Sequence, residues 1–168
     1  RDGGGYYHNV RLDCEKERTG VSVNGEGPIP ARVMLVGEAP GEHEERAGVP
    51  FVGPSGQELN RMLHEAGIMR SECYVTNVCR TRPPDNVLAH WMTRVKKNVT
   101  PAHKEWKGWW VLPQVLDGAA ALAAEIKMVQ PNLIIAFGNL ALLALTGQYG
   151  ILRWRGSQML MEDGTRVI

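Results

Sequence analysis

The stretch "GEAPGEHEERAGVPFVGPSGQEL", Gly37 to Leu59, lies between an apolar run and a helix-like pattern. The run RVMLV precedes it, and the pattern QELNRMLHEAG begins near its end. A connection between a strand and a helix needs only a few residues, whereas this one is long and rich in glycine, proline and glutamate. Ligands in α/β folds bind at the carboxyl ends of strands, so this stretch is a candidate binding loop.

Short apolar strands alternate with amphipathic helices along the chain. Strands are expected at residues 31–37, 73–78, 131–138 and 166–168. Helices are expected at residues 55–68, 115–130 and 139–147. Ser55 is the expected N-cap of the first helix, and Gly67 and Gly147 are expected at helix ends. This order predicts an α/β fold, a three-layer α/β/α sandwich with a central four-stranded parallel sheet.

The composition limits the classes of protein to consider. The chain has 168 residues, of which 43% are hydrophobic, enough for one domain with a core. The formal net charge of +1 means that affinity for nucleic acid or a membrane needs a local patch. No apolar run approaches the ~20 residues that span a bilayer, and no signal peptide is visible. Three cysteines without a C-x-x-C pair form no disulfide framework, which indicates a reducing, cytoplasmic location.

Several short motifs resemble the uracil-DNA glycosylase superfamily, closest to its family-4 type. GEAPG and PFVG in the opening stretch are followed by TNV at 76–78 and RPP at 82–84, in the family's order and spacing. The segment PNLIIAFGNLALLALTG and the later GILRWRGS also resemble the glycosylase-like regions of some phage DNA polymerases. The resemblance covers about residues 31–84 and 113–168 and implies a glycosylase-like domain over residues 31–168. Residues 1–30 are rich in glycine and polar, without a sustained period, which indicates an N-terminal arm with a short helix near 12–18.

The resemblance implies a pocket for a base flipped out of DNA. Phe51 would offer a flat face on which the base stacks. The Asn77 amide has both an acceptor and donors, which fit N3–H and O4 of uracil and oppose the pattern of cytosine. Glycines let the backbone approach the sugar and base closely. The expected base-binding residues are Gly37, Ala39, Pro40, Gly41, Phe51 and Asn77.

Loss of the base builds positive charge on the sugar, so nearby carboxylates stabilise the reaction. Glu38 is the leading candidate, for positioning water or stabilising the cation, and the expected catalytic set is Glu38, Asn77 and Glu44. The best-known branch of the superfamily has an Asp at the position of Ala39, so Asp-based water activation is not expected here. The expected DNA contacts are Ser55, Gly56, Arg80, Arg82 and Arg155.

Each assignment has a structural alternative. Phe51 could fill a core beside a loop, and Asn77 could cap a strand end. Ser55 could serve only as an N-cap, and a glutamate in a loop is usually solvated. His43 and His64 are given no role.

Family-4 enzymes hold an iron–sulfur cluster with four cysteines, which the resemblance places here at an N-terminal pair near Cys14, near Thr81 and near Gly118. At most one of these positions is a cysteine in this chain. Cys73 and Cys79 lie elsewhere, and three thiolates make a poor cluster or zinc site. No cofactor and no metal site are therefore expected.

The superfamily also uses a histidine loop shortly after the fourth strand. This chain ends at GTRVI, where that strand begins, and His90 and His103 come too early to match. The expectation is either a fragment or a shortened protein with part of the site. GQYGILRWRGS lacks the histidine of the covalently trapping relative, so no trapping is expected. The alternative to a uracil-DNA glycosylase is a catalytically silent domain, possibly phage-encoded, that binds DNA or a polymerase or other replication partner.

Residues 86–113 interleave basic and aromatic side chains in an insertion without a clean period. Charges for phosphates and rings for stacking suit a nucleic-acid strand. Alternatively, the tryptophans pack the insertion onto the core while the lysines are solvated. The residues concerned are Arg94, Lys96, Lys97, Trp106, Trp109 and Trp110, with Arg153 and Arg155 around Trp154 further on.

Overall fold

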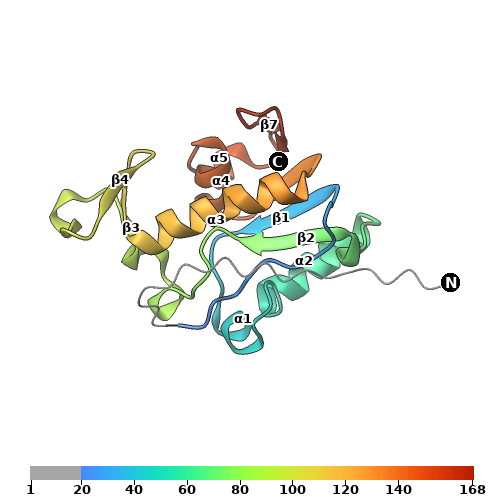
Figure 1. Ribbon diagram of the computed structural model, residues 1–168, viewed down its shortest axis with the longest axis horizontal. Helices are drawn as coiled ribbons and strands as arrows, with labels where there is room; N and C mark the ends of the chain where they lie inside the picture. Colours follow the sequence, from blue (N-terminus) through green and yellow to red (C-terminus); the bar gives the residue numbers. More distant parts are fainter. Residues whose placement is uncertain (1–19) are drawn as a thin grey trace.

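A sheet of five strands runs through the structure, a computed structural model that describes residues 20–168 (Figure 1). Its strands, in spatial order, are β2 (Cys73–Asn77), β1 (Val33–Gly37), β6 (Leu133–Ala136), β8 (Arg166–Val167) and β7 (Met159–Leu160). The first four are parallel, which confirms the predicted sheet, and β7 adds an antiparallel edge. A strand of two residues is too short to leave an alternating pattern, so the sequence does not predict β7.

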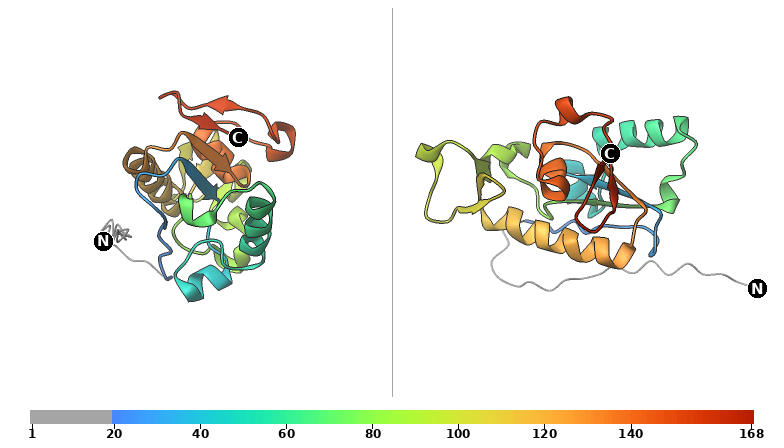
Figure 2. Two further views of the ribbon diagram at one scale, coloured as in Figure 1. Left: turned by 90° about the vertical axis from the view of Figure 1, so that its right-hand side faces the viewer. Right: turned by 90° about the horizontal axis from the view of Figure 1, so that it is seen from above.

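Helices cover both faces of this sheet. They are α1 (Glu42–Ala47), α2 (Pro54–Glu65), α3 (Pro113–Val129), α4 (Asn139–Thr146) and α5 (Ile151–Trp154). Successive strand residues point to opposite faces, so Met34 and Val36 of β1 pack with α3 and α4, while Leu35 packs with α2. Figure 2 shows α2 on one side of the sheet and α3 on the other, which is the predicted three-layer arrangement. None of the helices described between residues 20 and 168 is long and apolar enough to cross a membrane.

The ends of α2 differ slightly from the prediction. Gly53, not Ser55, is the N-cap, and Pro54 occupies the first helical position, where its missing N–H costs nothing. Ser55 therefore lies inside the first turn. At the other end Ala66 is the C-cap, and Gly67 follows it in the left-handed region at φ +69°.

Two further segments were not predicted as ordered elements. The short helix α1 occupies residues 42–47 of the opening stretch, where a charged run with no apolar face gives no helical signal. Residues 20–30 lie along the sheet, and Glu26 forms an antiparallel bridge with Val75 of β2. The predicted helix near 12–18 and Cys14 lie outside the described residues.

The insertion forms a second, antiparallel sheet in the order β3-β5-β4. Its strands are β3 (Met92–Thr93), β4 (Lys104–Trp106) and β5 (Trp109–Val111). Lys107 and Gly108 form the turn between β4 and β5, both with positive φ, as a two-residue hairpin requires. Short 3-10 turns lie at Arg70–Glu72, Pro84–Asn86, Leu88–His90 and Lys96–Asn98. Such short pieces explain why the insertion has no sequence period.

Candidate active site

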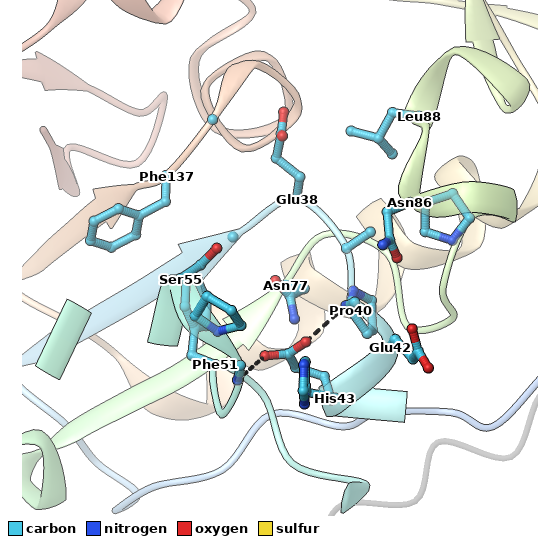
Figure 3. Close-up of a pocket in the computed structure, with 18 residues that line it drawn as sticks. Glu38, Pro40, Glu42, His43, Phe51, Ser55, Asn77, Asn86, Leu88 and Phe137 are labelled. Atoms are coloured by element: carbon cyan, nitrogen blue, oxygen red, sulfur yellow. Dashed lines mark hydrogen bonds between the residues drawn. The ribbon is translucent and has the colours of Figure 1, made fainter. Parts of the chain in front are cut away.

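A cavity of about 620 Å³ lies at the carboxyl edge of the parallel sheet (Figure 3). It is lined by residues 37–44, by Phe51 and 53–55, by Asn77, by Pro83, Asn86 and Leu88, and by 137–138. These segments follow β1, β2 and β6, and parallel strands end at one edge, so the sheet topology itself gathers them. The opening stretch thus surrounds most of the cavity.

Asn77 is the last residue of β2 and lies beside Gly37, its partner in the β1–β2 register. The residue is 4% exposed, yet its side-chain amide makes no hydrogen bond with any residue that the structure describes. Buried amides normally have partners, so this one is free to pair with a ligand. A Cβ at Gly37 would lie 2.3 Å from Asn77 Oδ1, and only glycine leaves room for the amide there.

Two aromatic rings form the adjacent wall. The rings of Phe51 and Phe137 meet edge to face, with centroids 5.9 Å apart and planes at 65°. Phe51 has φ +53°, a left-handed conformation that is unusual for a large side chain. Sequence reasoning missed Phe137, although its place directly after β6, at the carboxyl edge, is the signal that could have found it.

Glu44 lies in the cavity wall as a buried carboxylate with backbone partners. Its Oε1 accepts hydrogen bonds from the N–H of Val52 at 2.9 Å and of Gly53 at 2.7 Å, and its Oε2 accepts one from the N–H of Gly41 at 3.1 Å. Burial alone raises the pKa of Glu44, but the backbone donors, Gly53 foremost, outweigh it and hold the pKa below its usual value. The ionised carboxylate therefore ties the loop at Gly41 to the turn that carries Phe51.

Glu38 lines the opposite side of the cavity and reaches the N-terminus of α4. Its Oε1 accepts a hydrogen bond of 2.8 Å from the Leu140 N–H, where the helix dipole favours a negative charge. A Cβ at Gly138, which has φ +98°, would lie 2.3 Å from Glu38 Cδ. The second oxygen, Oε2, has no hydrogen bond within residues 20–168 and is available to a ligand or water.

The other expected base and phosphate contacts divide into two groups. Ala39, Pro40, Gly41 and Ser55 line the cavity, as does His43, to which the sequence assigned no role. Gly56 does not line it: the residue is buried, and a Cβ there would lie 1.9 Å from the Phe51 carbonyl oxygen. The glycine at this position lets α2 pack behind Phe51. Gly56 therefore has a packing role in the structure and not the expected role of a DNA contact.

The structure separates the three arginines that were expected to contact DNA. Arg80 is 7% exposed and pairs with Glu125 of α3 through Nη2 and Oε2, 2.7 Å apart, so its guanidinium is turned into the interior and is not placed to meet a phosphate. Arg82 lies near the cavity and its Nη1 is 3.5 Å from Glu45. Arg155 is exposed at the end of α5.

The insertion uses its aromatic residues mainly for packing. Trp106 and Trp109 are partly buried against the main core. The Arg94 guanidinium lies over Trp109, 4.3 Å from the ring centroid, and Trp109 stacks at a tilt on Tyr149, with centroids 4.5 Å apart. Lys96 and Lys97 are exposed. These contacts favour the packing interpretation for the tryptophans and leave the lysines on the surface.

The described residues do not fit an iron–sulfur cluster. Among residues 20–168 no group of three or more His, Cys, Asp or Glu side chains could hold a metal ion. At Gly118, one expected ligand position, a Cβ would lie 2.3 Å from the Val78 carbonyl oxygen, so a cysteine does not fit. Cys73 and Cys79 are both buried, and burial raises the pKa of Cys79 to about 12, which disfavours the thiolate that a metal needs.

Comparison with known proteins agrees with this geometry. The family model described as the uracil DNA glycosylase superfamily matches residues 24–165. A type-4 uracil-DNA glycosylase of Thermotoga maritima is 34% identical over 90% of this chain and 68% of its own length, and one of Saccharolobus solfataricus is 46% identical over 70% and 45%. A DNA polymerase of Bacillus phage SP01 is 30% identical over 90% of this chain but only 14% of its own length.

The chain thus spans between about half and two thirds of the length of these type-4 relatives. The identities extend well beyond the short motifs, over at least 119 residues in each of the three proteins named. Both the resemblance to family 4 and the resemblance to a phage polymerase are confirmed. The chain belongs to the uracil-DNA glycosylase superfamily.

Proposed function

We propose that this protein is a uracil-DNA glycosylase that hydrolyses the N-glycosidic bond of a uracil flipped out of DNA. The observation that carries the proposal is the nearly buried, unpartnered amide of Asn77, which faces a cavity beside the ring of Phe51. The names of the type-4 relatives support the same reaction class. DNA, single- or double-stranded, is the proposed substrate.

Recognition follows from the hydrogen-bonding pattern of the base. The Asn77 carbonyl oxygen accepts from uracil N3–H while its NH2 group donates to O4. Cytosine presents an acceptor at N3 and a donor at C4, so the same orientation of the amide rejects it. Phe51 stacks on the base, and the Phe137 ring packs edge to face with the Phe51 ring.

The two glutamates supply charge where the sugar becomes cationic. As the C1′–N1 bond breaks, positive charge builds on the sugar and the uracil leaves as an anion. Glu44 is ionised and provides a fixed negative charge, but its oxygens are engaged by backbone donors. Glu38 retains a free oxygen, so it positions the water whose oxygen bonds to C1′.

A phosphate beside the flipped nucleotide fits the start of α2. Ser55 lines the cavity in the first turn of this 12-residue helix, where backbone N–H groups point outward and the dipole favours an anion. Arg82, on the chain after β2, would add a second positive contact, and its guanidinium lies 3.5 Å from Glu45 and 3.8 Å from Glu42. Among the arginines discussed, Arg82 and Arg155 remain proposed DNA contacts.

We also propose that the domain folds and works without an iron–sulfur cluster. The support is the close approach at Gly118 and the buried, protonated thiol of Cys79. The test is an anaerobic purification followed by an iron assay and an absorbance spectrum. A band near ~400 nm with about four irons per chain would overturn the proposal.

An oligonucleotide assay tests the activity. Single-stranded and duplex DNA with one uracil is incubated with the protein and then with alkali, which breaks the strand at an abasic site. We expect cleavage, reduced at least about a hundredfold in Asn77→Ala and Phe51→Ala, because each removes a contact that the site makes to the base. The matched control is Asn132→Ala, an exposed asparagine before β6, which should retain full activity.

The second candidate is a catalytically silent domain that binds DNA or a replication partner. The match to a segment of a phage DNA polymerase favours it. Uracil-independent DNA binding without any cleavage would support this candidate and overturn the enzyme. Under either candidate we place the protein in the cytoplasm of a bacterium or a phage-infected cell, in keeping with its free cysteines.

A further inference from the structure

The turn that carries Phe51 is held in an uncommon backbone conformation. A φ of +53° at a phenylalanine is unfavourable and persists only where the surroundings fix it. Glu44 holds one side of the turn through the N–H groups of Val52 and Gly53. On the other side of the turn, the carbonyl oxygens of Pro50 and Phe51 need hydrogen-bond donors.

Arg70 supplies both of these partners. Its Nη2 donates to the Pro50 carbonyl at 2.7 Å, and its Nη1 donates to the Phe51 carbonyl at 3.1 Å. The same guanidinium is fixed by Asn60 Oδ1, 3.1 Å from Nη1, and by Glu26 Oε1, 3.5 Å from Nη2. Arg70 begins a 3-10 turn before β2 and does not line the cavity, so it reaches Phe51 from behind.

We propose that Arg70 is a positioning residue that sets the orientation of the Phe51 ring for base stacking. The carboxylate of Glu44 binds N–H groups and the guanidinium of Arg70 binds carbonyl groups, so opposite charges hold opposite poles of neighbouring peptides. A planar guanidinium presents two N–H groups to two acceptors at once, which a lysine ammonium cannot match in geometry. The stacking role rests on the proposed function, whereas the effect of Arg70 on the ring does not.

The chain has only two phenylalanines, Phe51 and Phe137, and both line the cavity. Labelling with 4-fluorophenylalanine therefore gives two fluorine resonances, which Phe51→Leu assigns. We expect Arg70→Met to shift or broaden the Phe51 resonance. Arg61→Met is the matched control, because within residues 20–168 Arg61 pairs only with Glu58 and Glu65, on the exposed face of α2. An unchanged Phe51 resonance in Arg70→Met would overturn the proposal.

Arg70→Lys is the second variant, for the case in which Arg70→Met does not fold. It keeps the charge but cannot place two donors in one plane, so the Phe51 resonance should still move. Resonances identical to the wild type in Arg70→Lys would show that charge alone suffices and would contradict a positioning role.

A double-mutant cycle separates positioning from general stability. Arg70→Met should lower kcat/KM on uracil DNA roughly tenfold in the wild-type background and hardly at all in the Phe51→Ala background. Equal losses in both backgrounds would overturn the proposal. If the wild type shows no cleavage, the proposed function fails, and the fluorine spectra still decide the question of Arg70.

Discussion

Replacing Gly37 with alanine tests the cavity most directly, because one methyl group meets both recognition side chains. The added Cβ would lie 2.3 Å from Asn77 Oδ1 and 2.6 Å from Phe51 Cζ. Atoms do not approach so closely, so the amide or the ring must move. The backbone of Gly37 lies outside the left-handed region, and alanine therefore adds no strain of its own.

The expected size of the effect follows from these two contacts. Crowding in a well-packed site costs about 1–3 kcal/mol of stability. Under the proposed function, a displaced amide loses its two hydrogen bonds to uracil, at about 1.4 kcal/mol each, and kcat/KM then falls about a hundredfold. The loss of activity should therefore greatly exceed what the loss of folded protein explains.

The assay is kcat/KM on a uracil oligonucleotide, measured together with urea unfolding. Gly67→Ala is the matched control, because its Cβ would point into open space at φ +69°. That variant should lose about 1–2 kcal/mol of stability through backbone strain and keep its activity. The reasoning is refuted if Gly37→Ala cleaves like the wild type, or if Gly67→Ala loses as much activity.

Three further predictions concern the framework of the site. Backbone donors lower the pKa of Glu44 despite its burial, so Glu44→Gln should cost about 1–3 kcal/mol in urea at neutral pH, and the difference should shrink as the pH falls below about 4.5 and the wild-type carboxyl protonates. Arg80→Met should cost about 3–5 kcal/mol, seen as a large drop in melting temperature, because it leaves Glu125 charged and buried. Gly118→Ala should also melt at a lower temperature, because its Cβ would overlap the Val78 carbonyl; an unchanged melting temperature in either of these variants would contradict the packing described.

The sequence predicted the parallel layers because their signals are local and repeated. Apolar runs marked β1, β2 and β6, and α3 and α4 have long apolar patterns. Helix α1 was not predicted because its residues form a charged run without an apolar face. The insertion sheet was not predicted because its strands of two or three residues are too short for an alternating pattern. Their conformation is set by contacts distant in sequence, such as the packing of Trp91 and Val111 into the main core.

The candidate site was likewise predicted where the signal is local and missed where it depends on distant contacts. Motifs in a fixed order identified the segments around Glu38, Phe51 and Asn77, and the cavity brings these three residues together. Burial and partner choice were not visible in the motifs. In the sequence, Arg80 is a basic residue beside a turn. Its partner Glu125 lies 45 residues later, and only the folded structure shows that the pair is buried.

That buried pair also bears on the absent cluster ligands. The resemblance places two of those ligands near Thr81 and Gly118, on the chain after β2 and at the start of α3, so a cluster would join these two segments. Here Gly118 and Glu125, seven residues apart on one face of α3, join them by other means. Gly118 brings the helix against the Val78 carbonyl, and Glu125 binds Arg80 just beyond it. Close packing and a buried ion pair thus connect the same segments, and this connection supports the proposal that the domain folds without a cluster.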